Sequence, residues 1–205
     1  MLAGKNIYWI GGSPCSGKST ISEILVDEFN FDMYKCDDHL GRYTQIGADN
    51  GAAIMKKLLS LDTDGIWLRS VDEQVADAFK FYGEALKIIV SDLEKMNDTK
   101  GILVEGAAIL PEFIQQHNID PSRYVCIVPT ERFQLKKYRQ RTWVDDVLKD
   151  CSDKEKAFEN WMNRDIAFAK IVRHQAEGYG HDVMITDGCA SVEATYARAK
   201  SALGL

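Results

Sequence analysis

A glycine-rich stretch near the start of the chain constrains the fold more than any other feature. Its residues are Gly12, Ser13, Pro14, Cys15, Ser16, Gly17, Lys18, Ser19 and Thr20. They fit the pattern G-x-x-x-x-G-K-[ST]. The β-branched and aromatic run Ile7–Ile10 precedes them, as a buried strand would, and apolar residues recur at helical spacing over 21–29. A strand, this loop and a helix in that order predict a phosphate-binding site; the alternative is a turn that caps the helix and binds nothing.

The residue types of this loop suit a nucleotide triphosphate and a magnesium ion. Gly12 and Gly17 let the backbone turn sharply and approach an anion closely. The loop's N–H groups and the positive end of the helix can then surround a phosphate chain. Lys18 can reach the β- and γ-phosphates, the Ser19 hydroxyl can ligate Mg²⁺, and Thr20 adds a hydroxyl near the α-phosphate. We therefore expect ATP and Mg²⁺ as cofactors.

Size, charge and cysteine content narrow the class of protein. A chain of 205 residues is most simply one domain. Its net charge of -6 argues against a general nucleic-acid-binding surface, and no apolar run is long enough for a membrane span. The first six residues lead directly into the first apolar run, so we expect no secretory signal. The five cysteines are scattered, which favours reduced thiols in a cytoplasmic protein; Cys15 is either a small filler or a redox control point.

Five short apolar runs alternate with helical or irregular stretches. The runs are Ile7–Ile10, Met33–Cys36, Ile102–Glu105, Tyr124–Val128 and Val183–Thr186. Strands that alternate with helices predict an α/β fold with a parallel sheet covered on both faces. Functional residues should then collect where the strands end, at the carboxyl edge of the sheet.

Polar residues follow the second and third runs and are the candidate substrate-binding set. Asp37 can organise Mg²⁺ through water or accept a proton from a substrate hydroxyl, although an Asp here can also cap a helix. Asp38 fits either role equally, and Arg42 follows closely. Glu105 can help to place Mg²⁺, bind a substrate hydroxyl or bond to local backbone, and Gly106 lets a ligand approach the backbone.

Helical periodicity predicts the elements between these runs. We expect a short helix over 47–60, a turn over 62–65, and then a loop with Trp67 and Arg69 that folds over a substrate. A long helix is predicted over 72–96, and the turn 97–101 ends it.

The stretch after the fourth run is rich in cations. Thr130 opens a helix, and Arg139 and Arg141 lie near its end, where the chain can reach over the phosphates. We interpret about 139–165 as a lid segment, and within it 145–153 as mobile.

The last two helices and the loop between them hold two further candidates. Within a helix over 154–177, Arg164 either points at phosphate or forms a buried pair with Asp165; the residues alone favour neither. After the fifth run, the loop with Asp187 can border an adenine base, and Ser191 can cap the last helix.

Taken together, these motifs resemble the P-loop small-molecule and nucleotide kinases, which include uridine kinase, shikimate kinase, gluconate kinase, chloramphenicol phosphotransferase and the adenylate kinases. The resemblance is carried by Gly12–Thr20, Asp37, Ile102–Gly106, Arg132–Arg141 and Thr186–Gly188. It covers most of the chain as architecture, but only the loop is strongly specific.

The resemblance implies a five-stranded parallel sheet in the order 2-3-1-4-5, with ATP and Mg²⁺ at its carboxyl edge. It implies that Asp37 is a base or Mg²⁺-organising acid, that Arg139 and Arg141 are lid arginines, and that Asp187 borders the adenine. The chain lacks the D-G-[FY]-P-R segment of nucleoside monophosphate kinases, which leaves a hydroxyl on a metabolite, a nucleoside or an antibiotic as the acceptor.

We therefore expect an ATP-dependent kinase for a small hydroxyl-bearing molecule, acting as a monomer or homodimer without nucleic-acid or membrane partners. Lys18 would neutralise phosphate charge, Asp37 would orient or deprotonate the acceptor, and Arg139, Arg141 or Arg164 would stabilise the transition state. The rival is a nucleotide-binding switch protein with no acceptor. A nucleic-acid-acting ATPase is disfavoured by the acidic net charge. It is also disfavoured because the third run ends in Glu105 and not in the Walker-B Asp.

Overall fold

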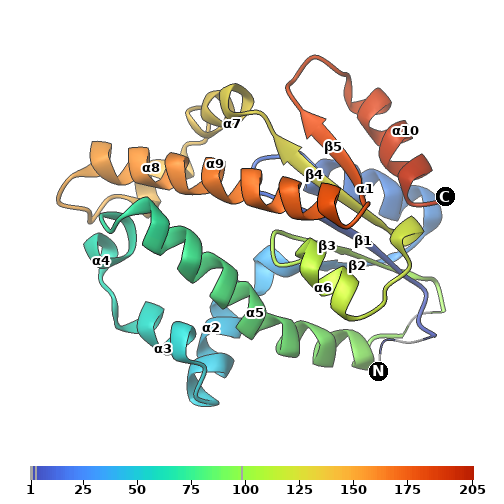
Figure 1. The fold of residues 1–205 in the computed structure, drawn as a ribbon, viewed down its shortest axis with the longest axis horizontal. Coiled ribbons are helices and arrows are strands. Elements are labelled where there is room, and N and C mark those ends of the chain that lie inside the picture. The colour runs from blue at the N-terminus through green and yellow to red at the C-terminus, as the bar shows by residue number, and fades with distance from the viewer. Residues whose placement is uncertain (1, 3, 98) are drawn as a thin grey trace.

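A parallel sheet forms the centre of the molecule (Figure 1). The computed structural model describes residues 2, 4–97 and 99–205. The strands are β1 (Ile7–Gly12), β2 (Asp32–Lys35), β3 (Ile102–Glu105), β4 (Tyr124–Pro129) and β5 (Asp182–Thr186). They pair in parallel in the order β2-β3-β1-β4-β5. The predicted α/β fold and strand order are confirmed, because all five apolar runs became strands of this one sheet.

Each strand sends alternate side chains to opposite faces of the sheet, as the two-residue period of a strand requires. On β1, Trp9 packs into the larger core and its neighbour Ile10 into the smaller one. The smaller core is covered by α1 (Lys18–Phe29) and α10 (Val192–Ala202). The larger core is covered by α5 (Val71–Lys95), α6 (Pro111–Gln116) and α9 (Lys154–Gly178). Both faces are therefore buried, which explains why the strands read as continuous apolar runs.

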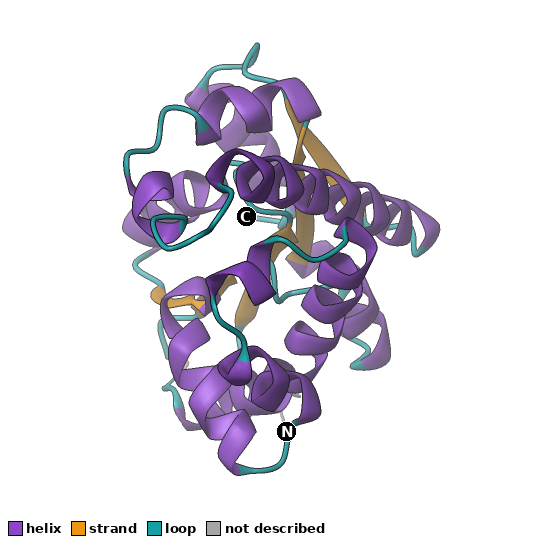
Figure 2. Cartoon of the chain, turned by 90° about the vertical axis from the view of Figure 1, so that its left-hand side faces the viewer, coloured by secondary structure: helices purple, strands orange, loops and turns teal. Residues whose placement is uncertain are grey.

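The other helices flank the carboxyl edge of the sheet (Figure 2). They are α2 (Leu40–Asp49), α3 (Ala53–Ser60), α4 (Thr63–Trp67), α7 (Glu131–Tyr138) and α8 (Trp143–Val147), with the short 3₁₀ turn η1 (Cys36–His39). A second 3₁₀ turn, η2 (Pro121–Arg123), leads into β4 at the amino edge. Within the described part of the chain, no helix combines the length and the apolar character needed to cross a membrane.

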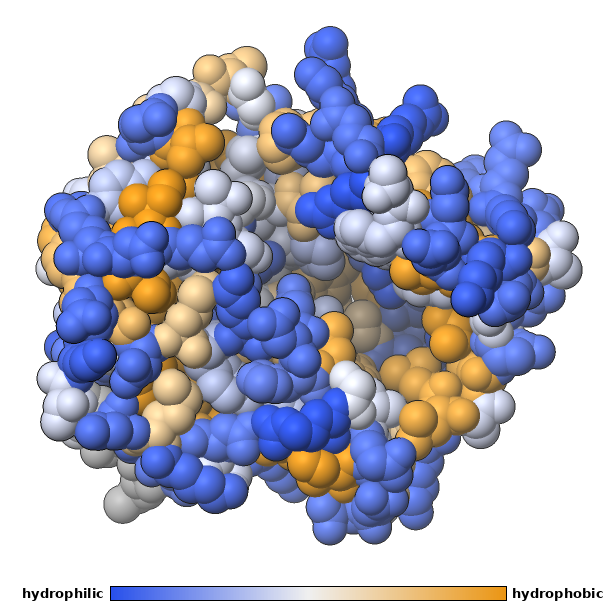
Figure 3. Space-filling model, turned by 180° about the vertical axis from the view of Figure 1, so that it is seen from behind, coloured by the Kyte–Doolittle hydropathy of each residue, from blue (hydrophilic) through white to orange (hydrophobic). Residues whose placement is uncertain are grey.

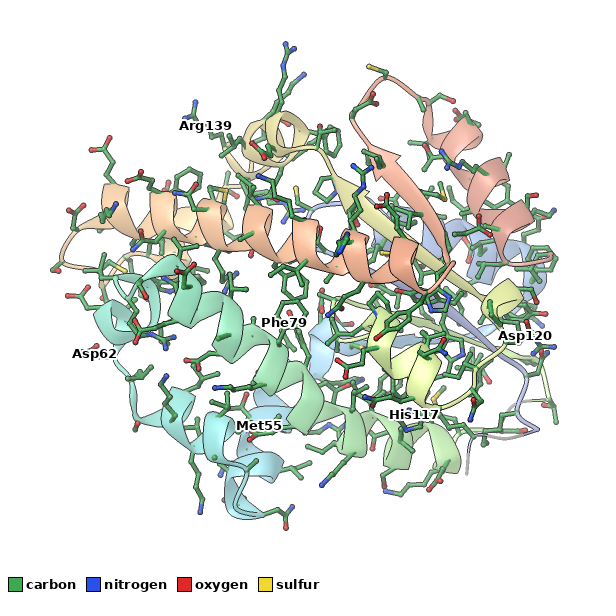
Figure 4. The ribbon with its side chains drawn as sticks, viewed as in Figure 1. Met55, Asp62, Phe79, His117, Asp120 and Arg139 are labelled. Atoms are coloured by element: carbon green, nitrogen blue, oxygen red, sulfur yellow. The ribbon has the colours of Figure 1, made fainter. Side chains whose placement is uncertain are left out.

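The two long helices α5 and α9 pack against one another across the front of the molecule (Figures 1 and 4). Phe79 of α5 contacts Phe168 of α9, with ring centroids 4.8 Å apart. Both helices lie within one residue of their predicted bounds. Part of the turn predicted over 97–101 falls on Asp98, which lies outside the described residues.

The prediction of one helix over 47–60 was wrong. The chain forms α2 and α3 here, and Gly51 lies between them with φ +88°, a conformation that no helix continues through. The two helices fold back on each other so closely that a side chain at Gly47 would collide with Met55, which Figure 4 labels. Gly47 is thus a packing residue rather than a helix start.

Two segments predicted as irregular are also helical. The turn at 62–65 is the first turn of α4, where the Asp62 carboxylate accepts a hydrogen bond from Gly65 N at 2.7 Å. The stretch 145–153, interpreted as mobile, contains the end of α8 and a buried anchor. Val144, Leu148 and Cys151 are all buried in a small third core that the lid segment itself largely forms. Their i, i+4, i+7 spacing is helical, but three residues in a short polar stretch are a weak periodic signal.

Candidate functional site

The loop Gly12–Thr20 lies at the carboxyl end of the central strand, and its shape is fixed by glycines and by contacts with β4 and β5. Gly12 has φ +123°, and a Cβ there would collide with the Ile127 carbonyl of β4. Ser13 N donates to that same carbonyl at 3.2 Å. From the next strand along the sheet, Thr186 Oγ1 of β5 donates to Ser16 O at 2.8 Å. The loop is therefore a rigid, preformed curve.

The helix that leaves this loop starts without a cap. Gly17 is the N-cap residue of α1, with φ +86°, no capping side chain and no acid in the first turn. Six other helices of the described chain have N-terminal N–H groups bound by a carboxylate or hydroxyl. The capping residues are Asp62, Ser70, Glu84, Thr130, Asp153 and Ser191. The free donors and positive end of α1 are what an anion requires.

Polar side chains inside the loop are buried without being satisfied. The hydroxyls of Ser13 and Ser16 have no hydrogen-bond partner among the described residues, although both residues are at most 2 % exposed. Lys18 is 5 % exposed, and its ammonium donates to Ser13 O at 2.7 Å, so the side chain folds back across the loop. Buried polar atoms are seldom left unpaired, and each costs about 1–3 kcal/mol. A ligand within the curve would satisfy them.

Ser19, the second residue of α1, forms a hydrogen bond with a buried acid. Ser19 Oγ donates to Glu105 Oε1 at 3.0 Å, and Glu105 is 2 % exposed. Its other oxygen has no partner in the described structure. Burial raises the pKa of Glu105; the Lys18 charge opposes this shift and the Asp37 charge adds to it. A hydroxyl next to a carboxylate with a free oxygen fits a hard cation such as Mg²⁺.

Asp37 stands beside this pair at the start of η1, where its carboxylate is exposed. Gly106 follows β3 with φ +153°, and a Cβ there would lie 2.6 Å from Cys36 Cβ and 3.4 Å from Asp37 Oδ1. A larger residue than glycine would thus push the Asp37 segment outward. Sequence reasoning placed Asp37, Glu105 and Gly106 together, and the structure brings them together.

Two of the predicted substrate-binding residues lie elsewhere. Asp38 is exposed and does not line the cleft described below. Arg42 points to α5, where it forms an ion pair with Asp92, and it also stacks on Tyr43 at 5.4 Å. Tyr34 donates to the same carboxylate at 2.7 Å. Arg42 is therefore engaged within the fold, away from the loop.

A cleft of about 520 Å³ opens next to the loop. Three walls line it. The loop wall is Pro14–Thr20; the lid wall is Tyr138, Arg141, Trp143, Trp161 and Arg164; the η1–α5 wall is Asp37, Leu40, Trp67 and Tyr82. The molecule is deeply hollowed when seen from behind, with hydrophobic residues on part of the hollow's wall (Figure 3). The volume suits a small-molecule site.

A larger hollow, of about 930 Å³, lies at the amino edge of the sheet. His117 and Asp120 border it, and Figure 4 shows them at the end of the molecule opposite Asp62. Its described lining residues include neither a glycine-rich loop nor the N-terminus of a helix such as α1. Ligands of open parallel sheets bind at the opposite, carboxyl edge.

Two of the three predicted lid arginines line the cleft. Arg164 donates through Nε and Nη2 to Asp165 Oδ1 at 2.8 and 2.7 Å and lies over the Trp67 ring at 5.1 Å. Arg141 lies over Tyr138 at 4.9 Å. Of the two alternatives left open for Arg164, the structure shows the pair with the buried acid Asp165. Arg164 also lines the cleft, and its contact with phosphate stays a prediction.

Arg139 does not line the cleft. It caps the end of α7 and projects outward, away from the sheet (Figure 4). It borders a separate groove of about 340 Å³. Asp187 is likewise off the cleft: it is exposed, and its carboxylate accepts from Cys189 N at 2.8 Å. Its predicted contact with an adenine stays a prediction.

No family model matches the chain. No curated protein matches it either. What the chain does must therefore be inferred from its own residues.

Sequence reasoning missed most of the aromatic lining of the cleft. Trp67 was noted in a supposed loop and Trp161 was assigned to the apolar face of its helix, whereas Tyr82, Tyr138 and Trp143 were given no role. Trp161 sits in the apolar stripe of α9, and that pattern looks the same whether a ring ends in the core or at a cleft. Only the packing of α4, α5 and α9 around the loop distinguishes a ring at the cleft from a ring in the core.

Proposed function

We propose that the protein is an ATP-dependent, Mg²⁺-requiring kinase of the P-loop type that phosphorylates a hydroxyl of a small molecule. The observation that carries the proposal is the loop itself. It brings together the uncapped N-terminus of α1, the buried ammonium of Lys18, and two buried hydroxyls, of Ser13 and Ser16, that have no partner among the described residues. These groups are costly in an empty loop and are matched by a phosphate chain.

The residues around the loop have distinct roles under this proposal. Lys18 and the N–H groups of the loop hold the β- and γ-phosphates, and Ser19 with Glu105 holds Mg²⁺. Bound ATP supplies the phosphoryl group, and Mg²⁺ compensates its charge. Asp37 orients the acceptor hydroxyl and takes its proton as the oxygen bonds to the γ-phosphorus, while the bond to the ADP oxygen breaks.

The lid wall supplies the remaining charge compensation. Arg141 and Arg164 can donate two hydrogen bonds each and stay charged, which suits a transferring phosphoryl group. Their neighbours Trp143 and Trp161 exclude water when a substrate fills the cleft. A predominantly apolar lid with two arginines is thus consistent with transfer to an acceptor rather than to water.

The proposal is tested by replacing Lys18 with Ala. We expect calorimetry with Mg²⁺ to detect ATP binding by the wild-type protein and a loss of phosphoryl transfer of about 10³-fold or more in the variant. Lys156→Ala is the matched control, since Lys156 is an exposed lysine paired with Glu159 on α9. Unchanged turnover in Lys18→Ala would reject the mechanism, and ATP binding without transfer to any acceptor would favour the switch protein instead.

A further inference from the structure

The carboxylate of Asp37 has no hydrogen bond of its own to hold it in place. It is exposed at the start of η1, and no described residue donates a hydrogen bond to it or forms an ion pair with it. Because Asp37 lines the cleft, its position there depends on where the backbone of η1 lies. A displacement of about 1 Å near the reacting atoms can cost about 10²-fold in rate. The contacts that fix η1 therefore bear directly on the proposed reaction.

One acid of α5 holds the chain on both sides of η1. Asp92 Oδ2 accepts a hydrogen bond at 2.7 Å from the hydroxyl of Tyr34, which lies on β2 just before η1. The same carboxylate forms an ion pair with Arg42 of α2, the helix that follows η1. Asp37 lies between these two contacts in the sequence. Asp92 therefore joins both ends of the segment that presents Asp37 to α5.

Two buried tyrosines extend these contacts into the core. The hydroxyls of Tyr34 and Tyr43 lie 2.7 Å apart, and the two residues are 6 % and 0 % exposed. Since Tyr34 gives its proton to Asp92, Tyr43 donates to Tyr34. Arg42 also lies over the Tyr43 ring, 5.4 Å from its centroid. Hydrogen bonds in such a chain polarise one another, so loss of the charged acceptor at its end weakens the whole chain.

Asp92 makes these contacts as a charged group. Its side chain is 19 % exposed. Burial alone would raise its pKa, but the hydrogen bonds from Arg42 and Tyr34 bring the pKa of Asp92 below its ordinary value. The carboxylate is therefore ionised at neutral pH, and removal of its charge would leave the guanidinium of Arg42 without its partner.

The turn itself has two supports, and Asp92 belongs to one of them. On one side, Cys36 is fully buried and packs so closely below Gly106 that a Cβ there would lie 2.6 Å from Cys36 Cβ. On the other, the His39 ring packs against the rings of Tyr34 and Tyr43, with centroids 5.0 and 5.9 Å away. The second support is thus the one whose two tyrosines are connected to the Asp92 carboxylate.

We propose that Asp92 is a positioning residue for phosphoryl transfer, which holds η1 through Tyr34 and Arg42 so that Asp37 meets the acceptor hydroxyl. The proposal rests on the proposed function, because Asp37 has an acceptor to act on only if the protein is a kinase. Asp92 is not among the described residues that line the cleft, so it touches no substrate. Its replacement should therefore lower kcat while ATP binding is kept.

The first test compares Asp92→Asn with a matched variant on the same helix. Glu84 is a second acid of α5, and its carboxylate accepts hydrogen bonds from Ile54 N and Met55 N of α3, at 3.0 Å each. Release of ADP from ATP and Mg²⁺ is measured with water, uridine, gluconate, shikimate and chloramphenicol as acceptors. We expect kcat with the best of these to fall about 10- to 100-fold in Asp92→Asn, with KM for ATP unchanged, and to stay within about twofold in Glu84→Gln. Equal kcat values in Asp92→Asn and the wild type would contradict the inference.

A double-mutant cycle on kcat shows whether Asp92 acts through Asp37. Asp37→Ala alone should lower kcat, and the addition of Asp92→Asn should then lower it no further, because the group to be positioned is already gone. A residue that only stabilised the fold would lower kcat by the same factor with and without the Asp37 carboxylate. Equal factors in the two backgrounds would overturn the inference and leave the kinase proposal standing.

Hydrogen exchange gives a readout that needs no turnover. We expect the backbone N–H groups of residues 36–39 to exchange about tenfold faster in Asp92→Asn than in the wild type, with no change over the loop Gly12–Thr20. Unchanged exchange over 36–39 would refute the inference on its own. Absence of ADP release by the wild type with every acceptor, water included, would instead refute the kinase proposal, and the inference with it.

Discussion

The loop wall and the η1–α5 wall of the cleft treat their polar groups in opposite ways. On the loop wall, Ser13 and Ser16 keep buried hydroxyls without a partner in the described structure. Near the η1–α5 wall, Arg42 and Arg69 are each paired with an acid of α5. The loop thus has unused hydrogen-bonding capacity, whereas these two arginines are already engaged in ion pairs. The difference teaches where the charge of a bound substrate would lie.

The lid segment holds a second contrast, between two arginines that are close in sequence but differ in whether they line the cleft. Arg141 lines the cleft, whereas Arg139 points outward beside a different groove. We expect Arg141→Ala to lower kcat by about 10²–10³-fold, because a charge-compensating donor in the transition state is lost. Arg139→Ala should stay within about twofold, which steady-state kinetics with saturating ATP would measure.

The two variants together test whether position, rather than charge, decides function. Both remove one positive charge from nearly the same part of the chain, so long-range electrostatics are matched. Equal losses in both variants would show that the lid rearranges and that Arg139 reaches the cleft. Arg141→Lys, which keeps the charge but loses the planar fork, should fall between the wild type and Arg141→Ala.

The contrast between these arginines also marks how far the sequence could lead. The loop and the strands were predictable because their patterns are local: a glycine with positive φ, a run of apolar residues, a Thr130 or Ser191 that caps a helix. Arg139 and Arg141 look alike in sequence, and their directions depend on how α7 ends and α8 begins. No local pattern contains that information.

The ion pairs and the aromatic lining were beyond the sequence for a related reason. Arg42 and Asp92 are 50 positions apart, and their contact exists only because α2 packs on α5. Trp161 and Tyr82 occupy helical apolar stripes that a core also requires. The segment near Leu148 was interpreted as mobile because one buried residue per turn is a weak signal, yet its buried residues are part of the core of the lid segment.

A second prediction concerns what holds the lid arginine in place. Asp165 is 1 % exposed and accepts hydrogen bonds from Arg164 and, at 2.8 Å, from the Tyr138 hydroxyl. Asp165→Asn removes the counter-charge of a largely buried guanidinium and should lower the free energy of unfolding by about 2–3 kcal/mol. Urea denaturation would measure this, and the lid wall should be the part that loosens.

A double-mutant cycle gives the control for that variant. Arg164→Met keeps the length of the side chain without its charge, so adding it to Asp165→Asn should recover part of the lost stability. If the two losses are simply additive, Asp165 does not act through Arg164. In that case the lid wall could not be said to hold its arginine through contacts within the fold, and it would no longer differ from the loop wall in this respect.

The smallest expected effect is on how stability depends on pH through Glu105, which lies next to the loop wall. Burial raises the pKa of Glu105 above its ordinary value of 4.5, against the opposing charge of Lys18. The folded chain thus holds this proton more tightly than the unfolded chain does. Stability from this group is therefore present below pH 4.5 and is lost as the pH rises through the raised pKa.

Glu105→Gln removes that titration while keeping an oxygen that can accept from Ser19. The difference in melting temperature, variant minus wild type, should grow in the variant's favour as the pH rises above 4.5 and then level off. With Mg²⁺ and ATP present the order should reverse, because the wild-type carboxylate then has a cation to hold and the amide does not. A flat difference across pH would mean that the buried carboxylate is not strained in the ligand-free protein, and the loop wall would then resemble the η1–α5 wall after all.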